Sequence, residues 1–93
     1  MNKRRVVITG LGVVASNGIG KEEFWQANIE GKSGVGLLTT FDTSTLNSKI
    51  AGQIKNFEPL KYIPEKVAKR VDRFVHLGLS SARIALEDSK INL

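Results

Sequence analysis

The chain has 93 residues, of which 41% are hydrophobic and 25% are charged, and its formal net charge is +5. This length suits one small domain, and the composition is typical of a folded protein, not a disordered one. The sequence holds no cysteine and one histidine, so disulfides, thiolate metal ligands and a cysteine nucleophile are excluded from these residues.

The sequence gives no sign of a membrane segment or a signal peptide. No apolar run approaches the roughly 18 residues that a membrane span needs. The basic start Met1–Arg5 is followed by an apolar stretch that is too short and too rich in glycine for a secretory signal. We therefore expect a cytoplasmic protein.

The positive charge is concentrated in two patches. Lys3, Arg4 and Arg5 contribute +3, residues 61–73 contribute another +3, and the remaining residues sum to −1. Patches of this kind favour an acidic partner, whether nucleic acid, an acidic membrane or an acidic protein.

The first predicted element is a strand over Arg5–Thr9, ended by Gly10. Its residues are mostly β-branched, and its apolar side chains run continuously instead of alternating. Such a strand is typical of a parallel sheet that is buried on both faces. A loop rich in glycine follows over residues 10–20, with Asn17-Gly18 as a turn signal.

A helix is predicted over Lys21–Glu30. Glu22 and Glu23 lie in its first turn, where the helix dipole favours carboxylates. Gly20 can precede the helix as its N-cap, and Gly31 can end it in a left-handed conformation.

The middle of the chain carries weaker signals. Phe24 and Trp25 are interpreted as packing residues, with Trp25 and Ile29 on one helix face. Residues 32–48 are rich in Gly, Ser and Thr and are predicted to be irregular. A second, weaker strand is predicted over Ile50–Phe57.

A long helical region is predicted from Pro64 to about Ser89. Apolar residues recur there at helical spacing: Val67, Val71, Phe74, Val75, Leu79, Ala82, Ala85 and Leu86. The region is long for one helix, and Asp72 could cap a second helix after a break near Val71. Many small residues between Val75 and Leu86 predict close packing against a sheet or another helix.

These elements do not complete an α/β domain. Two strands and two or three helices cannot cover a parallel strand on both faces, and short chains bury a small share of their surface. Ile91-Asn92-Leu93 stands where an α/β pattern would begin its next strand. The pattern therefore predicts that residues 1–93 form an incomplete part of a larger domain.

The glycines near the first strand match a dinucleotide-binding spacing. Gly10-Leu-Gly12-Val-Val-Ala15 fits G-x-G-x-x-[GA], and Glu30 lies 20 residues past Gly10. That chemistry needs a helix N-terminus directly after the glycines, facing the pyrophosphate. The predicted helix begins near Lys21 instead, so a structural turn is the better interpretation.

Four cations, Lys66, Lys69, Arg70 and Arg73, are spaced so that they share one face of a continuous helix. A solvated face is the ordinary interpretation, and docking of an acidic surface is the functional one. No aromatic or polar side chains of the kind that contact nucleic-acid bases lie between these cations. An acidic protein therefore fits at least as well as nucleic acid. His76 is interpreted as a helix residue at the edge of the core, without a catalytic role.

Several stretches resemble one enzyme family in their joint order and approximate spacing. They are Arg4–Val14, Phe24-Trp25, Gly31–Gly34, Phe41–Ser44, Ala51-Gly52, Arg70–Phe74 and Ala85–Ser89. Together they resemble the β-ketoacyl-(acyl-carrier-protein) synthases, specifically the synthase II branch, over essentially all 93 residues. The sequence departs from that family at 15–17, where the family commonly has a proline, and at His76, where Gln is more frequent.

The resemblance implies the N-terminal portion of a thiolase-like fold, with βαβαβ-type halves in a layered α/β/α/β/α arrangement. It implies an acyltransferase of fatty acid synthesis that works by decarboxylative Claisen condensation. In the family a cysteine, two histidines and a lysine carry this chemistry. None of them matches a position here, so no catalytic residue is assigned, and the 93 residues alone are expected to be inactive. No metal or dissociable cofactor is implied. The intact enzyme is expected to be a homodimer whose partner is the acyl carrier protein, with neither nucleic acid nor a membrane as a partner.

The resemblance also gives the cations a role. In the family, basic residues on the helix after the second strand bind the acidic helix of the acyl carrier protein, which holds the substrate on a phosphopantetheine arm. Lys66, Lys69 and Arg70 fall on those positions, and Arg73 follows only if the helix continues through Asp72. Such attraction is weak and sensitive to salt, as suits a partner that leaves after each cycle.

Three alternatives stay open. The chain could be a short non-catalytic remnant that at most binds a carrier protein, a dinucleotide-binding domain of an oxidoreductase, or part of a chain-elongating synthase of polyketide assembly.

Overall fold

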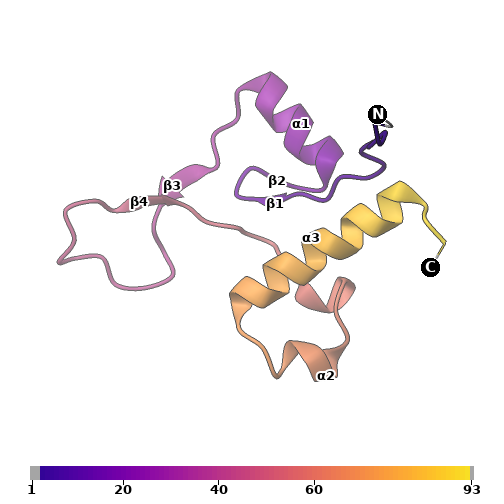
Figure 1. The fold of residues 1–93 in the computed structure, drawn as a ribbon. Helices are drawn as coiled ribbons and strands as arrows, with labels where there is room; N and C mark the ends of the chain where they lie inside the picture. The colour runs from indigo at the N-terminus through magenta and orange to yellow at the C-terminus, as the bar shows by residue number, and fades with distance from the viewer. Residues whose placement is uncertain (1–2, 93) are drawn as a thin grey trace.

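The computed structural model describes residues 3–92 and has a mixed α/β architecture with an open shape (Figure 1). The elements in chain order are β1 (Val14–Ala15), β2 (Gly18–Ile19), α1 (Lys21–Glu30), β3 (Val35–Leu37), β4 (Ile50–Gly52), the 3₁₀ turn η1 (Pro59–Lys61), α2 (Glu65–Ala68) and α3 (Arg73–Ser89). The radius of gyration is 16.8 Å, whereas a compact domain of 100 residues measures about 13 Å. The chain is therefore much more extended than an ordinary domain of its length.

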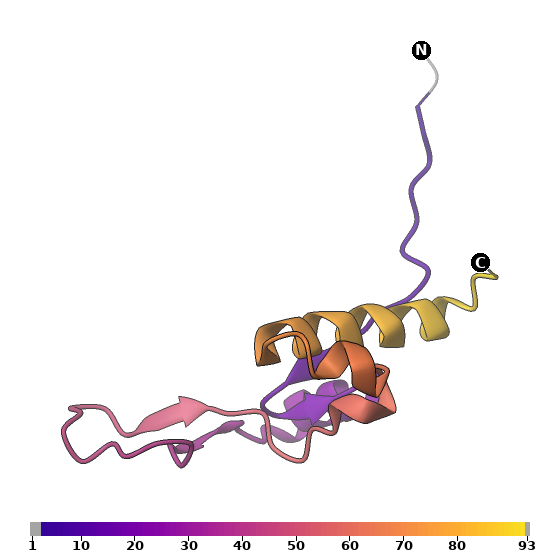
Figure 2. The same cartoon turned by 90° about the horizontal axis from the view of Figure 1, so that it is seen from below.

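The strand predicted over Arg5–Thr9 is absent, which corrects the sequence-based expectation. These residues form an extended segment that projects away from the helices (Figure 2). Val6, Val7 and Ile8 are 88%, 72% and 83% exposed. A strand is defined by hydrogen bonds to a neighbour, and residues 3–92 supply no neighbour along this segment.

The loop predicted over residues 10–20 contains a short antiparallel hairpin. Val14 pairs with Ile19 and Ala15 with Gly18, so the turn lies at residues 16–17, one position before the predicted Asn17-Gly18 turn. Gly18 is buried against the first turn of α1, where a Cβ atom would lie 2.6 Å from the backbone nitrogen of Phe24. The hairpin is thereby fixed to the start of α1.

Helix α1 has the predicted bounds. Gly31 follows it in the left-handed conformation (φ 71°), with its N–H donating to the carbonyl of Asn28. Ala27 is buried, but Trp25 and Ile29 are 64% and 62% exposed. Within the described residues, Trp25 is therefore packed much less than expected.

A second antiparallel hairpin interrupts the region expected to be irregular. Strand β3 pairs with β4 from Val35↔Gly52 to Leu37↔Ile50, and a long loop joins them. The Gln53 side chain extends the pairing, because its amide donates to the Leu37 carbonyl and accepts from the Thr39 N–H. The strand predicted over Ile50–Phe57 is thus only three residues long, and residues 53–57 lie outside it.

The predicted break in the C-terminal helical region is confirmed. Helix α2 ends at Ala68, and Asp72 has extended backbone dihedral angles before α3 begins. The Asp72 side chain makes no capping hydrogen bond, but its carbonyl accepts the first backbone bonds of α3.

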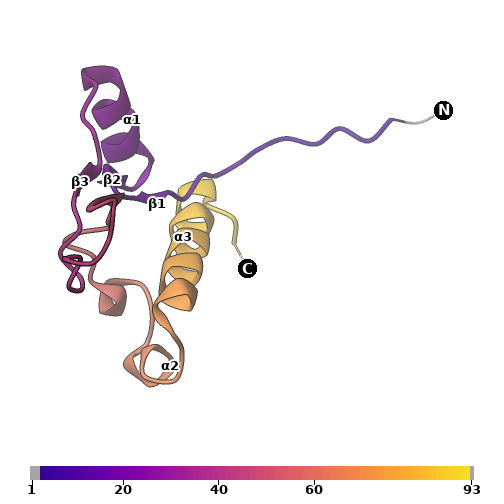
Figure 3. The same cartoon turned by 90° about the vertical axis from the view of Figure 1, so that its left-hand side faces the viewer.

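Helix α3 packs closely on the segment before β1, as its small residues predict (Figure 3). A Cβ atom on Gly10 or Gly12 would clash with the backbone of α3 at Ala85 or Ser81. These glycines therefore allow the backbone of this segment to lie close to the backbone of α3, and they form neither a turn nor a nucleotide-binding loop.

Few side chains of the described chain are fully enclosed. Ala27 and Ile63 are its buried hydrophobic residues, and Ser80 is its buried polar residue. Within residues 3–92, no helix is both long and apolar enough to cross a bilayer.

Candidate functional site

The candidate site is the surface formed by Lys66, Lys69 and Arg70, which we call the cationic surface. Lys66 lies in α2, and Lys69 and Arg70 follow directly in the turn that continues it. All three residues are exposed. Backbone bonds from Lys69 to Glu65 and from Arg70 to Val67 keep this turn helical. The i, i+3, i+4 spacing therefore places the three cations on one face.

One of these cations is already paired. Lys69 Nζ lies 3.0 Å from a Glu65 carboxylate oxygen, and both side chains are mostly exposed. An exposed pair of this kind is worth about 0–1 kcal/mol, so the ammonium can exchange Glu65 for another carboxylate at small cost.

Arg73, the fourth cation of the predicted stripe, is directed elsewhere. Its guanidinium donates to the Ile54 carbonyl at 3.1 Å and lies 5.8 Å from the centre of the Phe57 ring. The break before α3 turns Arg73 away from Lys66, as expected for a cap at Asp72. Arg73 thus holds the segment after β4 and is not part of the cationic surface.

His76 has a contact that sequence reasoning missed. Its Nε2 lies 2.7 Å from the Ala68 carbonyl oxygen, so the ring donates a hydrogen bond across the break between α2 and α3. The i, i+8 separation belongs to no standard capping pattern, so no local sequence signal predicts this contact. This hydrogen bond gives the ring a structural partner, in line with its interpretation as a helix residue at the edge of the core.

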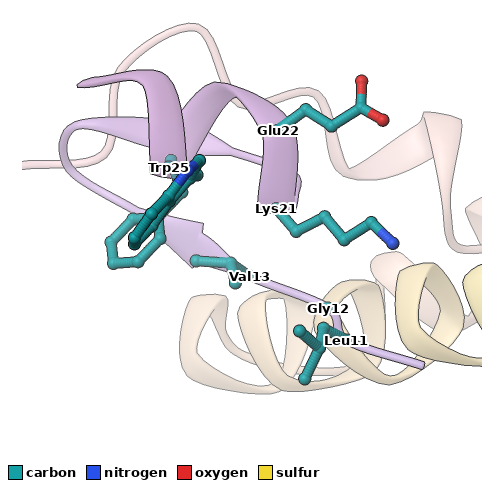
Figure 4. A pocket seen from close by; sticks show the side chains of 7 residues that line it. Leu11, Gly12, Val13, Lys21, Glu22 and Trp25 are labelled. Carbon is teal, nitrogen blue, oxygen red and sulfur yellow. The ribbon is translucent and has the colours of Figure 1, made fainter. Parts of the chain in front are cut away.

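An apolar groove of about 440 Å³ lies between α1 and the segment before β1 (Figure 4). Leu11, Val13, Phe24 and Trp25 form its apolar lining. Lys21 and Glu22 are the charged residues of its lining, and Lys21 is paired with a carboxylate of α3. Residues 3–92 hold no cluster of three His, Asp or Glu side chains that could bind a metal ion.

Asp88 links three segments near one edge of this groove. Its carboxylate forms an ion pair with Lys21 Nζ at 2.6 Å and accepts a hydrogen bond from the Leu11 N–H at 3.0 Å. These two donors stabilise the charged form and hold the pKa of Asp88 below its usual value. The carboxylate therefore ties α1 and the segment before β1 to the end of α3.

Residues 3–93 match the family model "Beta-ketoacyl synthase, N-terminal domain". A 3-oxoacyl-[acyl-carrier-protein] synthase 2 of Coxiella burnetii is 44% identical over all 93 residues. The tetracenomycin polyketide synthase ketoacyl synthase beta subunit of Streptomyces glaucescens is 37% identical over 84 residues, which are 90% of this chain. The chain spans only 22% and 20% of the length of these relatives.

A solved structure supports the same assignment of the fold. The ishigamide ketosynthase/chain length factor matches 98% of this chain at a TM-score of 0.87 and 32% sequence identity, over 23% of its own length. The fold is thus that of one part of a ketosynthase, as expected from the resemblance.

Proposed function

Because this chain belongs to the β-ketoacyl synthase family through that family's N-terminal domain, we propose that it is the N-terminal part of a 3-oxoacyl-(acyl-carrier-protein) synthase II. The observation that carries this proposal is the 44% identity, over the whole chain, to such a synthase. The intact enzyme is a cytoplasmic homodimer in this proposal, and residues 1–93 form an incomplete N-terminal domain within it.

The proposed reaction extends an acyl chain by two carbons. An acyl group is held as a thioester on a cysteine, and a malonyl thioester on the carrier protein loses CO₂ to give an enolate. The enolate carbon attacks the acyl carbonyl, a carbon–carbon bond forms, and the cysteine thiolate leaves. Residues 1–93 contain no cysteine, so the cysteine that holds the acyl group is not among them, and no metal or dissociable cofactor is proposed for them.

The proposed contribution of this chain is to bind the carrier protein. Exposed cations on one face suit a transient complex with an acidic helix, since charge complementarity raises the association rate without making the complex permanent. The exposure of Lys66, Lys69 and Arg70 supports this role. Because the Lys69–Glu65 ion pair is weak, the Lys69 ammonium can bind a carboxylate of the partner instead.

The test is charge reversal in the intact synthase. Replacing Lys66, Lys69 and Arg70 together by Glu should raise KM for acyl carrier substrates more than tenfold and leave KM for an acyl pantetheine thioester unchanged. A matched control replaces Lys3, Lys49 and Lys55 by Glu, which alters the net charge equally at exposed positions elsewhere. Equal loss with both substrates, or an equal effect of the control, would contradict docking at the cationic surface.

A polyketide ketosynthase subunit is the second candidate. The 37% identity to the tetracenomycin subunit favours it. The two candidates differ in product: a fatty acid synthase is followed by reduction of each 3-oxo group, whereas a polyketide synthase extends its own 3-oxo product repeatedly. Incubation of the intact enzyme with excess malonyl carrier, and the mass of the chains formed, separates them.

A further inference from the structure

Helix α2 cannot hold the cationic surface in place by itself. It is four residues long. In so short a helix, the loss of backbone conformational entropy exceeds the free energy gained from its few hydrogen bonds. Its orientation must therefore come from contacts with its neighbours in the fold.

Helix α3 supplies one such contact before α2 and another at its end. Before α2, the Arg83 guanidinium donates to the Tyr62 carbonyl at 3.0 Å. At the last residue of α2, the His76 ring donates to the Ala68 carbonyl at 2.7 Å. Both donors belong to the same long helix, so α2 is attached to a rigid element at each end.

The Ala68 carbonyl needs the partner that His76 provides. It belongs to the last turn of α2, where carbonyls lack an intrahelical donor. None of the backbone N–H groups of the described residues donates to it outside the helices. The hydrogen bond is partly buried, which protects it from competition with water. It closes a loop that contains Lys69 and Arg70 and fixes the helix end next to Lys66.

We propose that His76 is the positioning residue of the cationic surface: its Nε2–H donates to the Ala68 carbonyl and holds Lys66, Lys69 and Arg70 in the arrangement that an acidic partner helix binds. This inference rests on the proposed docking function. His76 itself touches no substrate, and it acts through the backbone of α2. A side chain at this position serves the same purpose if it carries an N–H donor at similar reach, as a glutamine amide does.

The experiment compares His76→Leu with His76→Gln in the intact synthase. Leu fills similar space and donates nothing, whereas Gln keeps a donor. His76→Leu should raise KM for the acyl carrier substrate about 2- to 12-fold, the range expected for one lost hydrogen bond. The kcat and the KM for an acyl pantetheine thioester should not change, and His76→Gln should restore the carrier KM to within about twofold of the parent.

A second measurement follows the backbone directly. Amide hydrogen exchange in residues 69–72 of the intact synthase should be faster in His76→Leu and close to the parent rate in His76→Gln. A Leu variant with an unchanged carrier KM, equal losses in the Leu and Gln variants, or equal losses with both substrates would each overturn the positioning role.

Failure of this inference is distinguishable from failure of the proposed function. If charge reversal at Lys66, Lys69 and Arg70 raises the carrier KM but His76→Leu does not, docking stands and His76 has no part in it. If charge reversal itself has no effect on the carrier KM, both proposals fall.

Discussion

The close approach of α3 to the segment before β1 makes the replacement of Gly12 by Ala a sensitive test of the structure. The new Cβ would lie 2.7 Å from the backbone nitrogen of Ala85 and still closer to the carbonyl oxygen of Ser81. Both atoms belong to a helix backbone and cannot rotate away, so the segment or the helix must shift. Gly12 has no positive φ angle, so this clash is the only new cost in the folded state.

The expected magnitude follows from measurements on overpacked cores. Such insertions cost about 1–3 kcal/mol of unfolding free energy, and each kcal/mol lowers the melting temperature by about 2–4 °C in a domain of 150–250 residues. Gly12→Ala should therefore lower the melting temperature of the intact synthase by about 2–12 °C.

The matched control is Gly78→Ala in α3. A Cβ atom there would meet no atom within 4 Å, and Ala is about 1 kcal/mol more favourable than Gly inside a helix. Circular dichroism melts should show this variant unchanged or more stable. A Gly12→Ala variant that melts at or above the parent temperature would refute the close backbone approach.

Two further predictions concern Asp88 and the size of the natural protein. Since the folded pKa of Asp88 lies below its usual value of 3.8, its contribution to stability is present above that value and is lost as the pH falls through the folded pKa. Asp88→Asn should therefore lower the urea midpoint of the intact synthase at about pH 6 but change it little once the carboxyl is protonated, and a constant difference at every pH would contradict the assigned contacts. The protein as made in its native cell should have a mass several-fold above that of 93 residues, and a mass near that of 93 residues would favour the short non-catalytic remnant.

The helices were predictable from sequence because their signals are local. The bounds of α1 follow from Gly20 and Gly31, and the break before α3 follows from Asp72. Close packing of α3 also follows from its small residues, although only the structure identifies Gly10 and Gly12 as the partners.

The strands were predicted poorly because pairing depends on distant residues. The continuous apolar run over Arg5–Thr9 indicates that these side chains favour burial on both faces of a strand. It does not indicate whether a neighbouring strand is present. Strand β3 was missed since Gly36 and the residues around it carry a weak strand signal, and it is defined by pairing with β4 across a long loop.

The candidate site was predictable in part. Lys66, Lys69 and Arg70 were found from their spacing, and their docking role stays a prediction. The contact between His76 and Ala68 was missed because it depends on the angle between α2 and α3. No local sequence pattern predicts that angle.

The open shape of the chain has a consequence for biosynthesis. In a synthase as long as the relatives, most of the protein is translated after this segment, which takes on the order of tens of seconds at about 5–20 residues per second. During that time Val6, Val7 and Ile8 are largely exposed and could pair with other nascent chains. Lys3, Arg4 and Arg5 directly precede them, and flanking charges of this kind oppose aggregation of an exposed apolar strand. The N-terminal cations therefore disfavour pairing of this exposed segment with the same segment of another chain.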